Sequence, residues 1–134
     1  MRFVVDSNVL FTFFWKTSVS HKLFQNSQLE LFSPEFALEE IKKYSEDIMK
    51  KAKISKGDFN SIRKKLVETI NFISIEKYAE FLSEAYKISP DKNDVDFVAL
   101  SLKLRCSIWS NDAIMKNQTN FKVLNTKEVI ELLY

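Results

Sequence analysis

Acidic side chains stand at points in the sequence where one type of segment gives way to another. Asp6 follows the β-branched and aromatic run 2–5, and Asp112 follows the similar run 107–110 with one residue between. Asp94 opens an almost wholly apolar, helix-like segment. The carboxyl ends of parallel strands share one edge of a sheet, so we expect these carboxylates to meet there. Each acid taken singly is also explained by capping of the helix that follows it.

Glu40 lies inside the apolar stripe of a helix predicted over residues 34–50, whereas Glu39 falls on the polar side. The stripe is formed at helical spacing by Phe36, Ala37, Ile41, Tyr44 and Ile48. A carboxylate facing a core is unfavourable unless it is paired or binds a metal. A buried salt bridge and a metal site therefore both remain open for Glu40.

Together these acids form a set of oxygen donors. Clustered carboxylates repel one another and attract a cation, and oxygen ligands without His or Cys favour Mg²⁺ or Mn²⁺ over zinc. Such ions polarise a phosphodiester, activate water and stabilise the leaving oxygen. The chain has one His, one Cys and one Gly, which excludes a His-based zinc cage, an internal disulfide and a Gly-rich phosphate loop. The sequence thus predicts a metal-dependent phosphodiesterase site at Asp6, Glu40, Asp94 and Asp112.

The elements that position these acids alternate between strand and helix. Strands are predicted at 2–5, 29–32, 72–75, 107–110 and 121–124, and helices at 8–15, 18–26, 34–50, 55–70, 76–88, 94–105, 112–116 and 126–133. Ser33 and Pro34 form a helix-start signal, with Ser as the cap and Pro at the first helical position. No hairpin turn joins two strands, which favours an α/β fold with a mainly parallel sheet covered on both faces. The 134 residues show no linker and are expected to form one domain, 1–134.

The overall composition narrows the class of protein further. The net charge of +2 excludes a strongly basic nucleic-acid coat and an acidic tail. No apolar run approaches the roughly 20 residues of a membrane span, and Asp6 and Asn8 interrupt the N-terminal apolar run. A single Cys suits a reducing compartment. We therefore expect a cytoplasmic protein without a membrane partner.

At these residues the chain resembles a PIN domain, the nuclease fold of VapC-type toxins and of several RNA-processing enzymes. The matching segments are VVDSNVL at 4–10, SPEFALEEI at 33–41, DKNDVDFVALSLKLRCSIWSND at 91–112 and KVLNTKEVIELL at 122–133. The resemblance spans nearly the whole chain, and the order and spacing of its four acids are moderately specific. It implies a three-layer α/β/α domain with Mg²⁺- or Mn²⁺-dependent endoribonuclease activity on single-stranded RNA, often as a homodimer.

The resemblance also implies roles for individual residues. Its four acids correspond to Asp6, Glu40, Asp94 and Asp112, while Asn8 and Ser110 stand at supporting polar positions. Asp96 stands where other members have a non-acidic residue, and either Asp91 or Asp96 is an alternative to Asp94. A lone PIN domain of this length is typical of the toxin of a toxin–antitoxin pair, which would add an antitoxin protein as a partner. The rivals are an RNA-processing nuclease without an antitoxin and a non-catalytic RNA-binding or scaffold module.

Two further groups of residues are candidates for contacts. Cations surround the break at 51–57 and could bind an RNA backbone or simply form a solvated surface: Lys50, Lys51, Lys53, Lys56, Arg63, Lys64 and Lys65. An aromatic cluster could belong to the core or line a dimer contact: Phe11, Phe13, Phe14 and Trp15. His21 and Cys106 are interpreted as structural.

Overall fold

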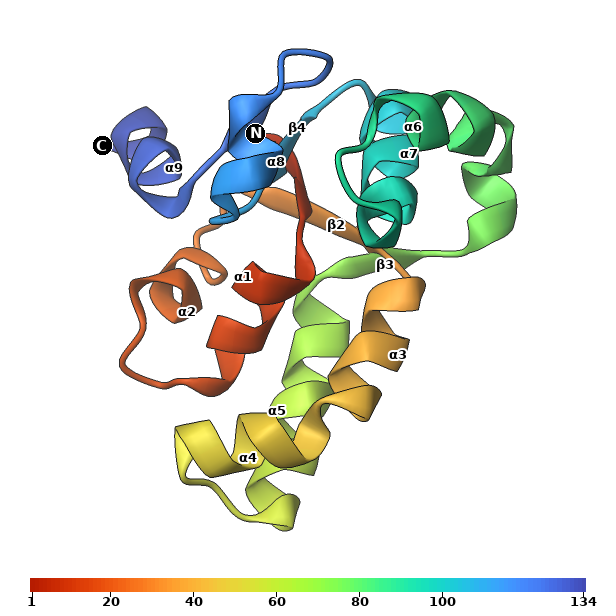
Figure 1. Ribbon diagram of the computed structural model, residues 1–134. Coiled ribbons are helices and arrows are strands. Elements are labelled where there is room, and N and C mark those ends of the chain that lie inside the picture. The colour runs from red at the N-terminus through yellow and green to blue at the C-terminus, as the bar shows by residue number, and fades with distance from the viewer.

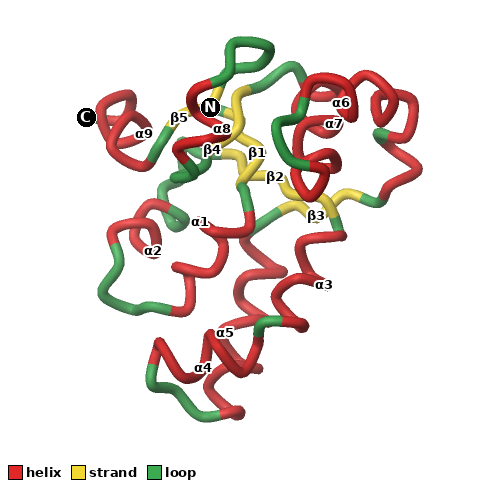
Figure 2. The backbone as a smooth tube through the Cα atoms, in the orientation of Figure 1, coloured by secondary structure: helices red, strands yellow, loops and turns green.

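The computed structural model describes residues 1–134 and contains a five-stranded, wholly parallel sheet. The strands are β1 (Arg2–Val5), β2 (Glu30–Pro34), β3 (Asn71–Ile73), β4 (Ser107–Trp109) and β5 (Val123–Leu124). Their order across the sheet is β3-β2-β1-β4-β5, which can be followed in Figure 2. From β1 the chain adds β2 and then β3 on one side, and it then crosses back to add β4 and β5 on the other side of β1. The boundary between β1 and β4 is therefore the point where the topology switches direction, where open parallel sheets characteristically bind ligands.

Helices cover both faces of the sheet, as the sequence predicts (Figure 1). They are α1 (Ser7–Phe11), α2 (Val19–Leu23), α3 (Phe36–Lys43), α4 (Ser45–Ala52), α5 (Lys56–Thr69), α6 (Leu82–Ile88), α7 (Val95–Leu104), α8 (Ala113–Asn117) and α9 (Thr126–Leu133). Four 3₁₀ turns complete the set: η1 (Thr12–Phe14), η2 (Ile75–Lys77), η3 (Ala79–Phe81) and η4 (Lys92–Asp94). The predicted three-layer α/β fold is confirmed.

The most apolar helix, α7, packs across β1, β2 and β4, and α6 packs against α7. Residues 97–101 of α7 are all buried, because this helix is covered on more than one side. On the other face, Trp109 of β4 is fully buried and its ring lies 5.2 Å from that of Phe24, just after α2. Phe14 of η1 stacks on Phe59 of α5 at 4.8 Å, which joins the first crossover to the second. Buried residues of both layers thus form a single core.

The predicted helix start at Ser33 and Pro34 is wrong, because both residues belong to β2. The Ser33 hydroxyl is fully buried and donates to the Val5 carbonyl oxygen of the neighbouring strand at 3.0 Å, so it is not available as a cap. The predicted helix 34–50 is also two helices, α3 and α4, which meet at Tyr44 (φ −99°, ψ 15°). Two acids in the first turn of α4 favour a new helix start at Ser45, and α4 runs away from the axis of α3 (Figure 1).

The helix predicted over 76–88 is shorter than expected. Residues 75–81 form the 3₁₀ turns η2 and η3, and regular helix begins only at Leu82. Between the two turns, Tyr78 is 1% exposed and its hydroxyl donates to Asp96 Oδ2 at 2.5 Å. This tertiary anchor holds Tyr78 at φ −123°, outside the helical region. The remaining predicted elements are present with ends shifted by a few residues, and α9 begins and ends as predicted.

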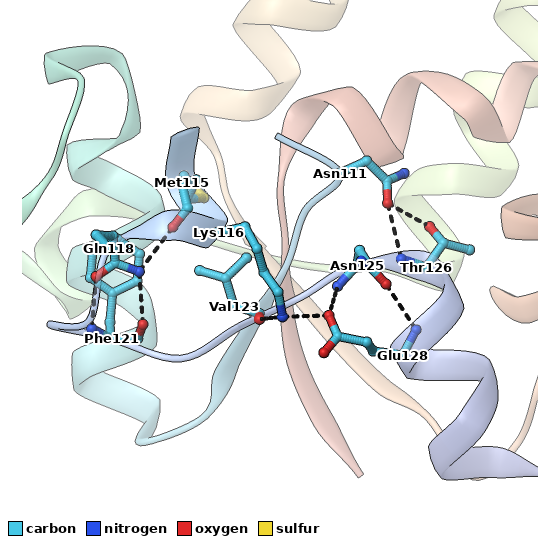
Figure 3. Close-up of polar contacts among 9 residues, drawn as sticks. All are labelled: Asn111, Met115, Lys116, Gln118, Phe121, Val123, Asn125, Thr126 and Glu128. Atoms are coloured by element: carbon cyan, nitrogen blue, oxygen red, sulfur yellow. Dashed lines mark hydrogen bonds and ion pairs between the residues drawn. The ribbon is translucent and has the colours of Figure 1, made fainter. Parts of the chain in front are cut away.

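The last helix, α9, begins at a capping box. Asn125 Oδ1 accepts from the Glu128 main-chain N–H at 2.9 Å, and Glu128 Oε1 accepts from the Asn125 N–H at 3.1 Å. Lys116 of α8 also pairs with Glu128, and its Nζ donates to the Val123 carbonyl oxygen at 2.9 Å (Figure 3). This capping box therefore ties α9 to α8 and β5 at the edge of the sheet.

We expect Asn125→Ala to lower the free energy of unfolding by about 1 kcal/mol, because it removes the cap oxygen at the start of α9. Urea unfolding followed by circular dichroism measures this change. Asn120→Ala is the matched control, because its side chain is exposed and makes no hydrogen bond. Equal stability of the two variants would contradict the assigned role of the cap.

Candidate active site

Asp6 lies at the switch point of the sheet, directly after β1. Its main-chain N–H donates to the Trp109 carbonyl oxygen at 3.0 Å, which joins the ends of β1 and β4. The side chain caps α1 and is 6% exposed. Its Oδ1 accepts from the Ser7 N–H at 2.8 Å, and its Oδ2 accepts from Ser110 Oγ at 2.7 Å and Asn8 Nδ2 at 3.1 Å. Burial and the charge of Asp112 raise the pKa of Asp6, although the bonds from Ser110 and Ser7 oppose that shift.

Glu40 reaches the same edge from α3, which begins where β2 ends. Its Oε1 accepts from Ser7 Oγ at 2.6 Å, so Ser7 links the carboxylates of Asp6 and Glu40. Burial raises the pKa of Glu40, and the charges of Asp6 and Asp96 add to that shift. The bond from Ser7 and the charge of Lys43 act in the opposite direction. Glu40 is thus half-buried among acids, as its place in the apolar stripe predicts.

Asp94 closes the 3₁₀ turn η4 immediately before α7. Because α7 leads into the start of β4, the beginning of this helix lies at the carboxyl edge of the sheet, beside Asp6. The Asp94 carboxylate makes no hydrogen bond and no ion pair with the protein. Burial and the charges of four other acids raise the pKa of Asp94 to about 7: Asp6, Asp91, Asp112 and Glu40. It is therefore the acid most in need of a counter-charge.

Asp112 caps α8, accepting from the Ile114 N–H at 2.9 Å, and its own N–H donates to Ser110 Oγ at 3.1 Å. The preceding Asn111 fixes this loop to the start of α9, because its Oδ1 accepts from both the N–H and the hydroxyl of Thr126 at 3.0 Å (Figure 3). Trp109 Nε1 donates to the same Thr126 hydroxyl at 3.0 Å. The segment just before Asp112 is thus fixed to the start of α9.

The two alternatives to Asp94 are placed differently. Asp96 lies in the first turn of α7, and its Oδ2 accepts from the buried Tyr78 hydroxyl, which gives it a structural partner. Asp91 is exposed and caps η4 through the Asn93 N–H at 2.9 Å. Both still contribute negative charge, since Asp96 acts on Glu40 and Asp91 acts on Asp94. Asp94 alone combines partial burial with freedom from protein partners.

The predicted supporting residues Asn8 and Ser110 are both in contact with Asp6. Asn8 Nδ2 also lies 3.3 Å from Ser110 Oγ, and Asn8 Oδ1 accepts from the Asn111 N–H at 3.4 Å. Ser7, which joins Asp6 to Glu40, was not predicted from the sequence. Its place directly after the first acid, on a short helix that must face the sheet edge, is the signal that could have revealed it.

The donor chemistry fits a hard divalent cation. The four acids supply only oxygen, and none of the three ion pairs in the structure involves any of them. Burial, together with repulsion by four other acids, raises the pKa of Asp94, and a bound cation would relieve that repulsion. No three His, Cys, Asp or Glu side chains are grouped closely enough to hold one ion as they stand. Water and substrate oxygens would therefore complete the coordination, as is usual for Mg²⁺.

Comparison with known proteins identifies the family. A family model described as "PIN domain" matches residues 4–130, which includes every acid considered above. The chain belongs to the PIN domain family. The resemblance noted from the sequence is therefore confirmed, over almost the full length of the chain.

A solved structure shares the fold of this PIN domain. The crystal structure of VapBC2 from Rickettsia felis bound to a DNA fragment from their promoter contains a chain that matches with a TM-score of 0.63 and 15% sequence identity. The match covers 93% of this PIN domain and 98% of that chain. No curated protein sequence matches significantly. None of the helices has both the length and the apolar character needed to cross a membrane.

The aromatic cluster of residues 11–15 is divided between the core and the surface. Phe13 and Phe14 are buried in the core, whereas Phe11 and Trp15 are only partly buried and line a groove with Tyr44. His21 stacks on Phe13 at 4.9 Å, and its Nδ1 lies 2.7 Å from the Phe13 carbonyl oxygen, which fits the structural role inferred for it.

We expect Ser110→Ala to lower the activity of this site about 10- to 100-fold, because it removes a hydrogen bond of about 1.5–3 kcal/mol to the Asp6 carboxylate. The lost bond also raises the pKa of Asp6 further, so the loss is largest at low pH. Phosphodiesterase rates over a pH series measure the effect. Ser101→Ala is the control, because Ser101 is equally buried but donates only to the Val98 carbonyl oxygen. A Ser110→Ala rate profile that overlays the native one would refute this role.

Proposed function

We propose that this PIN domain is a Mg²⁺- or Mn²⁺-dependent endoribonuclease that cleaves single-stranded RNA. The main support is that Asp6, Glu40, Asp94 and Asp112 lie at one edge of the sheet and that none of them forms an ion pair. Members of this family are generally nucleases, and residues 1–134 would act as one such domain. With one His and one Cys, the chain cannot build a metal site for phosphodiester hydrolysis from several His or Cys side chains.

Carboxylates of this set, completed by water and substrate oxygens, would hold the divalent metal, which when bound activates water and neutralises charge that develops on the phosphate. Asp6 would be held in place by Ser7, Asn8 and Ser110, so that its orientation does not depend on the substrate. Ser7 would keep Glu40 beside it. Asp94, with its pKa near 7, would be ionised by the arrival of positive charge. Asp6 and Glu40 would therefore be fixed in position, and Asp94 would lose its proton when the cation binds.

The test is cleavage of a labelled single-stranded RNA by the purified protein in Mn²⁺, in Mg²⁺ and in excess EDTA. We expect cleavage with either metal and none in EDTA, and much slower cleavage of a duplex of the same sequence. Undiminished cleavage in EDTA would refute metal dependence. A protein inactive in all three conditions, whose thermal midpoint Mn²⁺ leaves unchanged, would favour a non-catalytic module.

We further propose that the protein is the cytoplasmic toxin of a toxin–antitoxin pair and acts as a homodimer. Support comes from the likeness to a chain of VapBC2, over 93% of this chain and 98% of that one. A small neighbouring gene for a DNA-binding protein, whose product binds this protein and blocks RNA cleavage, is the expected finding. Without such a gene, an RNA-processing nuclease becomes the better account.

Part of the predicted basic surface forms a cleft of about 440 Å³ between the α3–α4 junction and α5. Of the predicted cations, Lys56 and Arg63 line it, and Lys42 joins them. None of the three forms an ion pair. The others lie outside the cleft: Lys50, Lys51, Lys53, Lys64 and Lys65. We propose that the cleft binds phosphates of the RNA backbone.

Arg63→Ala is expected to weaken RNA binding uniformly across sequences and to reduce the slope of log K against log [salt] by about 0.7, the value for one phosphate contact on a single strand. Fluorescence anisotropy at several salt concentrations, in EDTA to prevent cleavage, gives both quantities. Lys127→Ala is the control, because Lys127 is exposed on α9 and equally unpaired. If both variants show the same slope, the cleft does not contact phosphate.

A further inference from the structure

A pocket of about 210 Å³ lies beside the acidic cluster, between α3 and the turn η4. It is lined by Phe36, Glu39, Glu40, Lys43, Tyr44 and Asn93. Glu40 belongs to both the pocket and the cluster, and Asn93 directly precedes Asp94. A group bound in this pocket would therefore be a neighbour of the phosphate at the proposed reaction site.

Two aromatic side chains of the pocket are held in place by other rings. Tyr44 is 39% exposed and packs edge-on against Phe11 at 6.0 Å between centroids. Phe36 is partly buried and packs edge-on against Phe97 at 6.5 Å. Lys43 Nζ lies 5.4 Å from the centroid of the Tyr44 ring, which further limits the motion of that ring. The pocket thus has aromatic walls whose positions are set before any ligand arrives.

Three polar side chains of the pocket are free of hydrogen bonds to the protein. The side chains of Glu39, Lys43 and Asn93 make no hydrogen bond and no ion pair in the structure. Two carboxylates face one ammonium group, so the pocket as a whole repels phosphate. The cleft at Lys56 and Arg63 has the opposite charge, although α3 contributes residues to both.

We infer that this pocket binds one base of the RNA strand, adjacent to the phosphate held at the acidic cluster; the inference rests on the proposed ribonuclease function. Aromatic side chains bind the bases of single strands by stacking, and polar side chains read the exposed base edges. Glu39 accepts a hydrogen bond from an exocyclic amino group, as carboxylates do with cytosine N4. Uracil presents an acceptor at that position. The pocket therefore favours cytosine over uracil.

The experiment measures dissociation constants for short oligo-C and oligo-U RNAs by fluorescence anisotropy in EDTA, where no cleavage occurs. Native protein is expected to bind oligo-C more tightly. Tyr44→Ala weakens binding to both by about fivefold or more, the lower limit for loss of one stacked base. Because a base contact releases no counterions, the salt slope stays at the native value. Glu39→Ala removes the preference for oligo-C.

Two further variants separate this effect from a loss of folding. Tyr44→Phe keeps the stacking ring and is expected to bind as the native protein does. Tyr86→Ala is the matched control, because Tyr86 is 54% exposed and has Lys92 Nζ 5.3 Å from its ring centroid, yet lies outside the pocket. Native-like binding by Tyr44→Ala, or a change in its salt slope, overturns the base pocket but leaves ribonuclease activity standing. A native protein that neither binds nor cleaves RNA overturns both proposals.

Discussion

Asp6→Asn is expected to lower RNA cleavage by about 100- to 1000-fold, with the fold intact. The replacement keeps the size of the side chain and one oxygen, which still accepts from the Ser7 N–H and caps α1. An amide nitrogen takes the place of the oxygen that accepts from Ser110, and the Ser110 hydroxyl can turn to accept from it. It removes the negative charge at the centre of the acidic cluster, where metal binding contributes several kcal/mol to stabilising the transition state. Initial cleavage rates of a labelled single-stranded RNA at saturating Mn²⁺ measure the loss.

The thermal stability of Asp6→Asn shows whether a lower cleavage rate comes from loss of the carboxylate or from unfolding of the protein. Asp6 is buried and its pKa is raised, so its ionised form is unfavourable in the folded protein without metal. We therefore expect the midpoint of thermal unfolding in EDTA to be equal to or above the native value. Glu131→Gln serves as the charge-matched control, since Glu131 is exposed on α9 and makes no ion pair. If Asp6→Asn cleaves as fast as Glu131→Gln, the assignment of Asp6 is wrong.

Asp94→Asn is expected to make the metal-free protein more stable than the native one at neutral and higher pH, and equally stable in acid. The pKa of Asp94 is raised from 3.8 to about 7. Between these values the folded protein keeps a proton that the unfolded chain has released, so native stability falls as the pH rises through this window. Asn cannot ionise, and the variant lacks this contribution. The difference between the two proteins therefore grows from about pH 4 to about pH 7.

Thermal unfolding in EDTA at several pH values gives this difference directly, and a second series with Mn²⁺ tests the metal. Mn²⁺ is expected to raise the native midpoint more at pH 8 than at pH 5, because protons compete with the cation for Asp94. Asp94→Asn loses most of that gain. Asp91→Asn is the control for the neighbouring exposed acid, and it should retain the response to Mn²⁺. If Asp91→Asn abolishes the rise in midpoint with Mn²⁺ and Asp94→Asn keeps it, Asp91 rather than Asp94 binds the metal.

Much of the architecture could be predicted from local patterns, because strand-like runs alternate with helical ones and no hairpin signal occurs. The failures come from contacts between distant residues. Ser33 and Pro34 carry a helix-start pattern, but the Ser33 hydroxyl bonds to β1, and this contact decides its conformation. Tyr78 sits in a helical pattern, but its hydroxyl reaches Asp96 across the packed layer. A one-dimensional pattern does not contain either contact.

The candidate site was predictable to the extent that chain direction determines it. Acids that follow β1 and β4 must lie at one edge, and Glu40 was marked by its place in the apolar stripe, which survives the break at Tyr44 because α3 still contains it. The bond from Ser7 to Glu40 was not predictable, since it depends on the distance between α1 and α3. The pocket beside the site is equally a product of packing, because it needs α3 and η4 side by side.

The hydrogen bond between Ser110 and Asp6 joins residues 104 positions apart in the chain. Synthesis proceeds from the N-terminus, so Asp6 and Glu40 emerge long before the segment that carries Ser110 and Asp112. A nascent chain that ends before β4 contains the segments of α1 to α7 but lacks Asp112 and the Ser110 hydroxyl that orients Asp6. The complete set of four acids can therefore assemble only after the chain has been synthesised beyond Asp112.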